Sequence, residues 1–553
     1  MKLLTALFLL LVSCHGVCAE PFPSDDEIRS ILRARVDTFK QSVGMVVGLI
    51  DEEGTRIIGY GRSHTEGGHA VNGGTIYEIG SISMVFTTLV LADMVRRGEV
   101  KLTDPVSRYV PEGVRLPTRG GREITLLDLA THRSGLPRMP DDVVVDLDAA
   151  TDDYSLDRMY AYLSSCSLID DIGARYYYSN LGFGLLADVL ARRAGQDFEQ
   201  VLIDRVCGPL GLIDTRFGLT AAQRDRKAGV HDWRHGKTPE MEFGGMKGAG
   251  ALRSTARDLL RFLAANAGLD DTVLWAPAQL SHLHRRSAGG NVDVGLGWHS
   301  HTHGGRRLVV HNGATYGNIS FAGFDREGRR GVVVLSNARG VIDDIGVHLL
   351  DPTARLARFD EPDVYPPAVD LPIEKLSRLA GEYLLGTHAV TVVSVEDDAL
   401  YGSYNDGLKF PLRAASDHEL FTELGPGVMD FGDFEDNRPQ KVTVRYLGHE
   451  MTGERIEDYH RAPKRVDVPD ESFDRYVGEY ALESGLELTV RVRDGALMIQ
   501  ADGQSELSTV RTQAGFYSAS AKAEIVFDED EAGRVVGVVL RQDEEYRGRK
   551  LGN

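Results

Sequence analysis

The sequence predicts an α/β domain over residues 25–360, followed by two all-β domains over residues 370–463 and 467–553. Strand-like segments at both ends of the first region enclose a helical middle, which is typical of one sheet built from both ends of a domain. A proline-rich linker, from Glu361-Pro362 to Pro366-Pro367, comes next, and long helical patterns nearly vanish after it. The remainder repeats itself at a period of about 97 residues, which indicates a duplicated unit.

The spacing of apolar residues places the elements of the first domain. A helix is expected over Glu27–Gln41, and a hairpin follows in which Val43–Ile50 pairs with Arg56–Gly61 across an acidic turn. Another helix follows Ser81 and stops at Arg96-Arg97-Gly98, because a glycine after basic residues commonly ends a helix. Further helices are expected at 181–194 and 255–267, and further strands at 294–299, 308–311, 319–325 and 331–336.

The C-terminal repeat can be followed in short motifs. Gly381-Glu382-Tyr383 returns as Gly478-Glu479-Tyr480, and Asp398-Ala399-Leu400 returns within Asp494-Gly495-Ala496-Leu497. Each unit consists of short alternating segments joined by turn residues, which favours a small antiparallel barrel. Residues 461–470 link the two units, and the barrels offer surfaces for homo-oligomer formation.

Composition narrows the class of partner. The 553-residue chain has a net charge of −20, with 42% hydrophobic and 26% charged residues, which is ordinary for a soluble globular protein. No basic patch interrupts the acidity, so neither nucleic acid nor an anionic membrane surface is an expected partner. No apolar run is long enough to span a membrane. We therefore expect a small-molecule or peptide substrate.

The first residues predict export. Lys2 precedes the apolar run Leu3–Val12, and Val17-Cys18-Ala19 offers a cleavage site, so residues 1–19 are interpreted as a signal peptide. A second interpretation is a lipoprotein box ending at Cys14, which would anchor the chain by a lipid. A secreted or periplasmic protein cut after Ala19 is favoured, because that site is a good ordinary one.

Removal of the signal peptide leaves two cysteines, Cys166 and Cys207. Both are flanked by apolar residues, which favours buried free thiols over a disulfide bridge. The cysteines therefore predict neither a disulfide scaffold nor a thiolate metal site.

Three short motifs carry candidate chemistry. Ser81 follows Gly80 at the start of a helix, where backbone N–H groups stabilise developing negative charge. Tyr178-Ser179-Asn180 lies at a loop-to-helix junction, so a phenol and an amide can share one side of a cleft. His311-Asn312-Gly313-Ala314 ends a strand, and the glycine lets a substrate backbone lie along the strand edge. Each motif alone is more often a cap, an aromatic core or a strand end, but together they indicate one site.

In this order, Ser81, Tyr178-x-Asn180 and His311-x-Gly313 resemble the motifs of the penicillin-recognising serine hydrolases. This family includes class C β-lactamases, DD-peptidases, D-aminopeptidases and related esterases. The segments 124–136 and 248–255 resemble further family blocks. The resemblance implies a β-lactamase/transpeptidase-like α/β (α+β) fold, with an antiparallel sheet flanked by helices and a helical subdomain. The two C-terminal units resemble the lipocalin-like barrels of D-aminopeptidase-type members.

The resemblance also implies roles for single residues. Ser81 would be the acylated nucleophile, and Tyr178 would carry the proton between it and the leaving group. The N–H groups of Ser81 and Ala314 would form the oxyanion hole. Asn180 would bind the substrate amide. His311 and Gly313 would line the substrate side of the cleft.

His311 bears on substrate preference. A lysine at this position supplies a fixed charge for a substrate carboxylate, whereas an imidazole is mostly neutral near neutral pH. With a histidine at position 311, the third motif therefore resembles that of the aminopeptidase and esterase branches more than that of true β-lactamases.

Met84 departs from the family pattern, in which a lysine three residues after the serine takes the hydroxyl proton. A thioether neither holds nor delivers a proton at neutral pH. Loss of general-base help removes a factor of roughly 10²–10⁴ in rate. Methionine has about the length of lysine, so the fold should tolerate the exchange. A neutral His311 could accept the proton instead if its ring reaches Ser81.

Other candidate sites are weaker. His299, His301 and His303 alternate along a strand, but a polar hairpin tip is favoured over a metal site for want of a carboxylate or cysteine partner. The pairs Asp152-Asp153 and Asp170-Asp171 are interpreted as solvated, and His132 is interpreted as stabilising its turn. Because no phosphate-cradling glycine pattern is present either, neither a metal nor a cofactor is expected.

Two functions follow from these residues. The first is an exported serine hydrolase that forms an acyl-enzyme on Ser81 and cleaves amide or ester bonds of small peptides, with activity reduced by Met84. The second is a catalytically impaired relative whose cleft binds a peptide or cell-wall fragment. A third, weaker idea makes the barrels regulatory, with a loop that caps the cleft.

Overall fold

The computed structural model describes residues 21–140, 143, 154–357, 367–456 and 473–551, apart from short gaps. The gaps fall at 233, 284, 290–291, 304–305, 386–388, 397, 405–409, 423–426, 447–448, 484–486, 494–495, 502–506, 512–514, 519–522, 531–533 and 542–544. Several predicted features lie outside the described residues: the signal peptide 1–19 with Cys14, Asp152-Asp153, Glu361-Pro362, Pro366 and the linker 461–470. The chain divides into two compact units, residues 1–455 and 456–553, and each is described by itself.

An eight-stranded sheet with the order β2-β1-β10-β9-β8-β7-β6-β5 forms the centre of the first region. β1 pairs with β10 in antiparallel fashion, with Met45 opposite Ser336 and Ile50 opposite Gly331. The prediction that both ends of this region build one sheet is therefore confirmed. The strands are β1 (Gly44–Asp51), β2 (Gly54–Gly61), β5 (Arg286–Gly289), β6 (Val292–Val294), β7 (His299–His303), β8 (Arg306–Ala314), β9 (Ile319–Asp325) and β10 (Arg330–Ser336).

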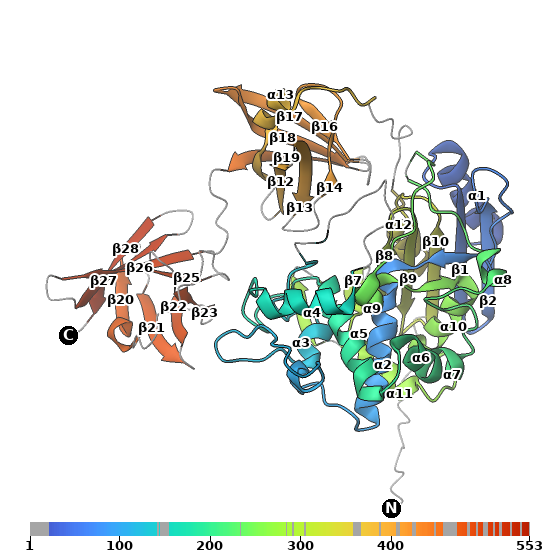
Figure 1. The fold of residues 1–553 in the computed structure, drawn as a ribbon, viewed down its shortest axis with the longest axis horizontal. Helices are drawn as coiled ribbons and strands as arrows, with labels where there is room; N and C mark the ends of the chain where they lie inside the picture. The colour runs from blue at the N-terminus through green and yellow to red at the C-terminus, as the bar shows by residue number, and fades with distance from the viewer. Residues whose placement is uncertain are drawn as a thin grey trace, which may run out of the picture. The chain divides into compact units, whose positions relative to one another are not determined.

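Helices cover both faces of this sheet (Figure 1). Val46 and Val333 belong to the larger core, which also contains buried residues of α2 (Ser83–Arg96) and α10 (Ala256–Ala267). Met45 and Val332 belong to a second core with α1 (Asp25–Arg33) and α12 (Asp343–Leu350). Because successive side chains of a strand point to opposite faces, adjacent residues serve different cores.

Local sequence determines where the helices begin and end. α5 (Asn180–Ala194) begins after Ser179, whose side chain accepts a hydrogen bond from the Gly182 N–H, and it ends at Gly195, with a φ of 68°. Glycine adopts this left-handed cap conformation without the steric cost of a Cβ. The helix predicted at 181–194 is therefore confirmed. The other helices of this region are α3 (Leu126–Ala130), α4 (Leu156–Ser165), α6 (Phe198–Leu202), α7 (Gly208–Leu210), α8 (Ala221–Arg224), α9 (Lys247–Gly250) and α11 (Trp275–His282).

The first helix is shorter than predicted. Ser24 and Glu27 form a capping box at the start of α1, which explains its sharp beginning. After Arg33 the backbone continues as a π-helical stretch, Ala34–Thr38, so the helical segment ends before the predicted Gln41.

The predicted strand at 294–299 is wrong. β6 ends at Val294, and the Gly295 N–H donates to the Trp298 carbonyl at 2.8 Å in a turn that leads into β7. Gly297 has a φ of 74° in this turn, a conformation that glycine reaches easily. The apolar alternation thus spans two strands and the turn between them.

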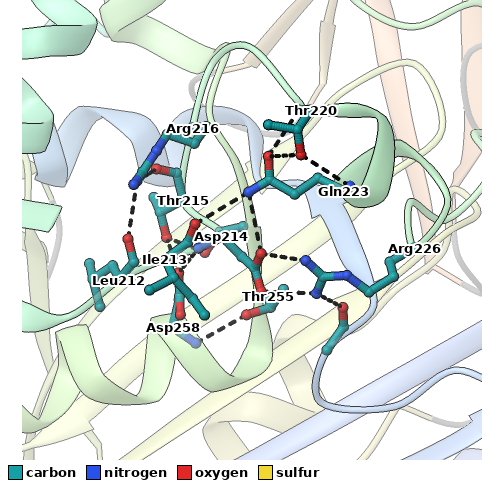
Figure 2. Close-up of polar contacts among 12 residues, drawn as sticks. Leu212, Ile213, Asp214, Thr215, Arg216, Thr220, Gln223, Arg226, Thr255 and Asp258 are labelled. Atoms are coloured by element: carbon teal, nitrogen blue, oxygen red, sulfur yellow. Dashed lines mark hydrogen bonds and ion pairs between the residues drawn. The ribbon is translucent and has the colours of Figure 1, made fainter.

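A buried polar network stabilises the segment before α10 (Figure 2). Asp258 is 1% exposed and accepts hydrogen bonds from the Asp214 N–H at 2.8 Å and the Thr215 hydroxyl at 2.9 Å. The Asp214 carboxylate is itself paired with Arg226 at 2.9 Å. Burial raises the pKa of Asp258. The loop before α8 is therefore tied to the first turn of α10.

This network supports a short ladder beneath the first motif. Thr255 caps α10, and it ends β4 (Arg253–Thr255), which pairs with β3 (Ile76–Glu78). β3 leads directly into the turn that carries Ser81. The network therefore fixes the base from which the candidate nucleophile projects.

Two further antiparallel sheets, each of nine strands, lie in the C-terminal part. The first has the order β14-β13-β12-β11-β19-β18-β17-β16-β15 and the second β23-β22-β21-β20-β28-β27-β26-β25-β24. In each sheet the two outermost strands are consecutive in the chain and are separated by a single residue, Leu412 or Thr509. The two edges of each sheet therefore meet, which gives it a barrel-like curvature.

The strands of the first sheet are β11 (Gly381–Leu385), β12 (Ala389–Glu396), β13 (Ala399–Tyr404), β14 (Phe410–Pro411), β15 (Arg413–Ala414), β16 (Glu419–Phe421), β17 (Gly427–Glu435), β18 (Arg438–Tyr446) and β19 (His449–Ile456), preceded by α13 (Ile373–Leu376). Those of the second are β20 (Gly478–Leu482), β21 (Glu487–Arg493), β22 (Ala496–Ala501), β23 (Leu507–Ser508), β24 (Val510–Arg511), β25 (Phe516–Ser518), β26 (Ala523–Glu529), β27 (Val535–Arg541) and β28 (Glu545–Leu551).

Equivalent contacts confirm the internal repeat. β11 begins at Gly381 and β20 at Gly478, 97 residues later. The Tyr383 hydroxyl donates to the Leu379 carbonyl at 2.8 Å, and the Tyr480 hydroxyl donates to the Tyr476 carbonyl at 2.7 Å. The limits 370–463 and 467–553 of the two domains stay predictions.

Cys166 and Cys207 are both free thiols, as predicted, although Cys166 is only half-buried. Burial raises the pKa of the Cys207 thiol to about 12, so this sulfur is not reactive at neutral pH. Within the described parts of the chain, no helix combines the length and the apolar character that a membrane span requires.

Candidate active site

Ser81 lies in a short 3₁₀ turn, Gly80–Ile82, directly before α2. Gly80 has a φ of 51°, in the left-handed region that glycine adopts at little cost. The Ser83 hydroxyl donates to the Gly80 carbonyl at 2.7 Å and accepts from the Leu252 N–H at 3.0 Å. The turn is therefore held from within and from the neighbouring chain segment, and Ser81 precedes a helix as the sequence predicts.

β8 brings the third motif beside this turn. β7 pairs with β8 only up to Val310, so among the described strands residues 311–314 have β9 on one side and no partner on the other. The Thr315 N–H donates to the Asn318 carbonyl at 2.9 Å, so by the antiparallel alternation the N–H of Ala314 points away from β9. On that side lies Gly80, where a Cβ would be 2.7 Å from the Ala314 nitrogen. The backbone segments that carry Ser81 and Ala314 are thus adjacent, as an oxyanion hole requires.

Gly313 makes this close approach possible. A Cβ at this position would lie 2.0 Å from the Ile79 carbonyl oxygen and 2.6 Å from the Ser320 hydroxyl oxygen. The Ser320 hydroxyl donates to the same Ile79 carbonyl at 2.8 Å, which ties β9 to the segment before Ser81. Only glycine therefore lets the strand and the turn pack at this distance.

Tyr178 is brought together with Ser81. The Ser81 hydroxyl is near enough to the Tyr178 phenol to lower its pKa as a hydrogen-bond partner, and the half-buried Tyr178 ring stacks on His132 with a centroid separation of 4.4 Å and an interplanar angle of 23°. Burial raises the pKa of Tyr178, while the hydrogen bond to Ser81 and the charge of Arg138 lower it less. The phenol therefore keeps its proton near neutral pH.

Asn180 begins α5 and is 6% exposed. Its side-chain nitrogen donates to the Met139 sulfur at 3.2 Å, and its backbone N–H donates to the Arg138 carbonyl at 2.9 Å. Asn180 therefore lies beside the loop that contacts Tyr178. Within the described residues, none of its hydrogen bonds joins it to Ser81.

His311 is 2% exposed and neutral. Burial lowers its pKa to about 4, although a hydrogen bond to the Asn312 carbonyl raises it slightly. That bond, at 2.7 Å, places the ring proton on Nδ1, so the buried Nε2 is an acceptor, and it has no partner among the described residues. The His311 ring centroid lies 6.5 Å from that of Tyr178.

Met84 is fully buried and belongs to the larger core. Tyr178 packs against the same core. The position three residues after Ser81 therefore holds an apolar thioether in a dry environment, without a group that titrates.

The structure places beside this site several residues that the sequence did not assign to it. Tyr176 and His299 are hydrogen-bonded at 2.7 Å, His299 lies 5.1 Å from His311 by ring centroids, and Arg138 lies 4.7 Å from the Tyr178 ring centroid. His132, interpreted from sequence only as a turn residue, accepts a hydrogen bond from the Ser179 N–H at 3.0 Å. These aromatic and imidazole rings come from separate segments, so no local pattern reveals them.

The acidic pair Asp170-Asp171 is engaged in ion pairs, so its interpretation as solvated is wrong. Asp170 is buried and forms an ion pair with Arg175. Asp171 approaches Arg119 at 2.8 Å. Both carboxylates therefore stabilise the loop before the second motif, an arrangement that a local sequence pattern does not reveal.

The histidines of β7 do not converge on one point. His299 is bonded to Tyr176, and His303 approaches the Asp351 carboxylate at 2.6 Å. β7 and β8 form a hairpin with His303 opposite Arg306, in line with the hairpin interpretation. Among the residues that the structure describes, no cluster of histidine, cysteine or acidic side chains could hold a metal ion.

A pocket of about 620 Å³ is lined by residues of α4, α5 and α9, among them Asp188, Arg192 and Lys247. None of the seven predicted site residues lines it. Arg192 is paired with Asp188 at 2.6 Å in the wall of this pocket. The predicted site residues at the Ser81 turn are therefore separate from this pocket.

Buried neutral histidines predict a loss of stability in acid. Burial lowers the pKa of His311 and of His282 to about 4 each, below the ordinary value of an unfolded chain. As pH falls from about 6.5 to about 4, the unfolded state takes up these protons first, so stability present near neutral pH is lost. We expect the free energy of unfolding to fall by roughly 2 kcal/mol per histidine between about pH 7.5 and pH 5.

This prediction can be checked by tryptophan fluorescence during urea unfolding, because all three tryptophans precede the C-terminal sheets. His282→Gln removes one titrating group away from the Ser81 turn. The fall in unfolding free energy between the two pH values should be smaller in this variant than in the wild type. An equal fall in both proteins would contradict the prediction.

Comparison with known proteins agrees with this geometry. A family model described as Beta-lactamase matches residues 32–350, which is more than half of the chain. The chain therefore belongs to the β-lactamase family. A second family model, described as a domain of unknown function (DUF3471), matches residues 462–553.

Individual relatives are similar at modest identity. The D-alanyl-D-alanine-carboxypeptidase/endopeptidase AmpH of Escherichia coli is 29% identical over 269 residues, 46% of this chain and 69% of the relative. A β-lactamase of Escherichia coli is 28% identical over 300 residues, 53% of this chain and 75% of the relative.

Among solved structures, a β-lactamase/D-alanine carboxypeptidase from Yersinia pestis gives a TM-score of 0.52 at 24% identity, over 60% of this chain and 97% of the other. A class C β-lactamase from Rhodobacter sphaeroides gives 0.51 at 22% identity, over 59% and 98%. These likenesses show the β-lactamase fold. The predicted fold class is therefore confirmed. The relatives named above include hydrolases, which supports the prediction that this chain is a hydrolase.

Proposed function

We propose that this protein is a serine hydrolase that cleaves amide or ester bonds of small peptides through an acyl-enzyme on Ser81. The nearness of the Tyr178 phenol to the Ser81 hydroxyl carries this proposal, because it puts a group that can relay a proton beside a nucleophile. The N–H of Ala314 points toward the Ser81 turn and would stabilise the negative charge of the tetrahedral intermediate.

The proposed reaction begins with attack of the Ser81 oxygen on the substrate carbonyl carbon. The Ser81 proton passes to the Tyr178 oxygen as that phenol hands its own proton to the leaving amine or alcohol. Water then attacks the acyl carbon and reverses these transfers. Asn180 would orient the substrate amide, and the substrate backbone would lie along the edge of β8 that β7 leaves unpaired beyond Val310.

The proposed activity is slow for an electrostatic reason. A protonated phenol is a poor base, and burial raises the pKa of Tyr178. Met84 is buried and carries no charge that could lower that pKa or take the proton itself. General-base assistance is therefore weak, and its loss lowers the rate of acylation by a factor of roughly 10²–10⁴.

The neutral His311 supports a substrate that does not rely on a carboxylate at this position. Burial lowers its pKa to about 4, so it offers a hydrogen-bond acceptor rather than a charge. D-aminoacyl amides and esters meet this condition better than penicillins do. The D-alanyl-D-alanine specificity in the name of one relative supports peptides with D-residues.

A second candidate function is peptide binding without turnover. The observation that favours it is Met84, since the rest of the Ser81 turn, the β8 edge and the Tyr178 contact can form a cleft without the missing base. In this case the cleft would hold a D-peptide or cell-wall fragment as a receptor.

Intact-mass measurement after incubation with a fluorophosphonate tests the proposal. We expect one slow adduct in the wild type and none in Ser81→Ala, because the adduct forms on the activated hydroxyl. The control Ser165→Ala changes an exposed serine that is bonded within its own helix, and it should be labelled like the wild type. If neither a fluorophosphonate nor a penicillin forms an adduct, the hydrolase proposal is wrong. Calorimetric binding of a D-peptide without turnover would then favour the receptor.

A further inference from the structure

Arg138 stands beside the candidate proton carrier. Its guanidinium carbon lies 4.7 Å from the centroid of the Tyr178 ring, within cation–π distance. Arg138 is exposed, so it reaches the ring from the solvent side. Among the described residues no carboxylate forms an ion pair with it. Its charge is therefore available to the phenol.

The backbone holds Arg138 in this place. Its carbonyl accepts hydrogen bonds from the Asn180 N–H at 2.9 Å and from the Leu181 N–H at 3.3 Å. These are the first residues of α5, two and three positions after Tyr178. The loop that carries the arginine and the segment that follows the tyrosine are thus tied together by backbone hydrogen bonds, which keep the base of the Arg138 side chain beside that segment.

The other groups around Tyr178 are uncharged at neutral pH. His132 stacks on the ring, and burial and nearby positive groups hold its pKa well below the usual range. His311 lies 6.5 Å away by ring centroids and is neutral because it is buried. Tyr176 carries a phenol whose pKa burial raises, and Ser81 is a neutral hydrogen-bond partner. The Arg138 guanidinium is thus the positive charge that faces Tyr178 among the described residues.

We propose that Arg138 is a positioning residue that stabilises the phenolate of Tyr178 and so supplies the positive charge that Met84 cannot provide. The argument rests on geometry: a permanent cation within 5 Å of the ring favours the deprotonated form of a phenol. Arginine suits this role because its planar guanidinium stacks on aromatic faces and carries a positive charge. The inference deepens the proposed function, since it concerns the same Ser81–Tyr178 pair.

Titration of a single labelled phenol tests this. Difluorotyrosine placed at position 178 titrates at lower pH than tyrosine, and fluorine NMR reports that residue alone. In the full-length chain, Arg138→Met should raise the titration midpoint by about one pH unit, because the nearby positive charge is lost. Arg138→Lys keeps the charge and should stay close to the wild-type midpoint.

A matched control separates this from general effects of arginine removal. Arg158 lies 4.8 Å from the ring of Tyr154, a different tyrosine, so Arg158→Met should leave the midpoint at position 178 unchanged. An unchanged midpoint in folded Arg138→Met, or an equal rise in both methionine variants, would overturn the inference. The readout needs no turnover, so a shifted midpoint in a protein that gives no Ser81 adduct would uphold Arg138 while the hydrolase proposal fails.

Discussion

Met84→Lys is expected to raise the rate of acylation at Ser81 by roughly 10²–10⁴-fold. Met84 is fully buried one helical turn after the nucleophile, so an amine placed there lies in a dry environment that favours its neutral form. A neutral amine can take the Ser81 proton, and once charged it stabilises the Tyr178 phenolate. The measurements are the rate of fluorophosphonate labelling and kcat/KM for an ester and a D-aminoacyl anilide.

Met84→Leu is the matched control, because it keeps the apolar volume and adds no base. Its labelling rate should equal that of the wild type. The lysine variant should also unfold at lower urea concentration, since burial of an amine without a partner costs free energy. A folded Met84→Lys protein that is labelled no faster than the wild type would show that the missing amine does not limit the reaction.

Gly313→Ala is expected to reduce acylation by roughly 10²-fold or more, which is the effect of losing one oxyanion donor. The added Cβ would lie 2.0 Å from the Ile79 carbonyl oxygen, a backbone atom that has no rotamer to change. β8 must therefore move away from the Ser81 turn and take the Ala314 N–H with it. The cost in stability should be about 1–3 kcal/mol, as for other overpacked positions.

The control for this variant is Gly218→Ala. Gly218 is exposed, and the nearest atom to a Cβ there is a Glu199 carboxylate oxygen at 3.9 Å. Its labelling rate and its urea midpoint should match the wild type. If Gly313→Ala is labelled as fast as Gly218→Ala, the β8 edge does not hold the oxyanion donor on Ser81.

Much of the fold could be predicted because its signals are local or repeated. The strand at 319–325 follows from alternation and a clear turn, and the 97-residue period is visible as matching motifs in the sequence itself. The segment 294–299 fails because two short strands and the tight turn between them share one alternating pattern. Apolar alternation indicates a strand but does not show where the hydrogen bonds to its neighbours stop.

The candidate site was only partly predictable for a similar reason. Ser81, Tyr178 and His311 are found because each belongs to a short motif at an element boundary. Arg138 and His299 have no such motif, and their relation to Tyr178 and His311 exists only through packing between distant segments. The charged and neutral groups around the Tyr178 phenol can therefore be identified only from the three-dimensional structure.

The one-residue links at Leu412 and Thr509 have a consequence for how the chain could change over evolutionary time. In each curved sheet the two edge strands follow one another in the chain, and β11 and β20 begin at equivalent points, Gly381 and Gly478. Recombination between these points removes or adds one whole period without cutting a strand. Loss or gain of one period would leave each remaining sheet with its strand order intact and its two edge strands still joined by a single residue.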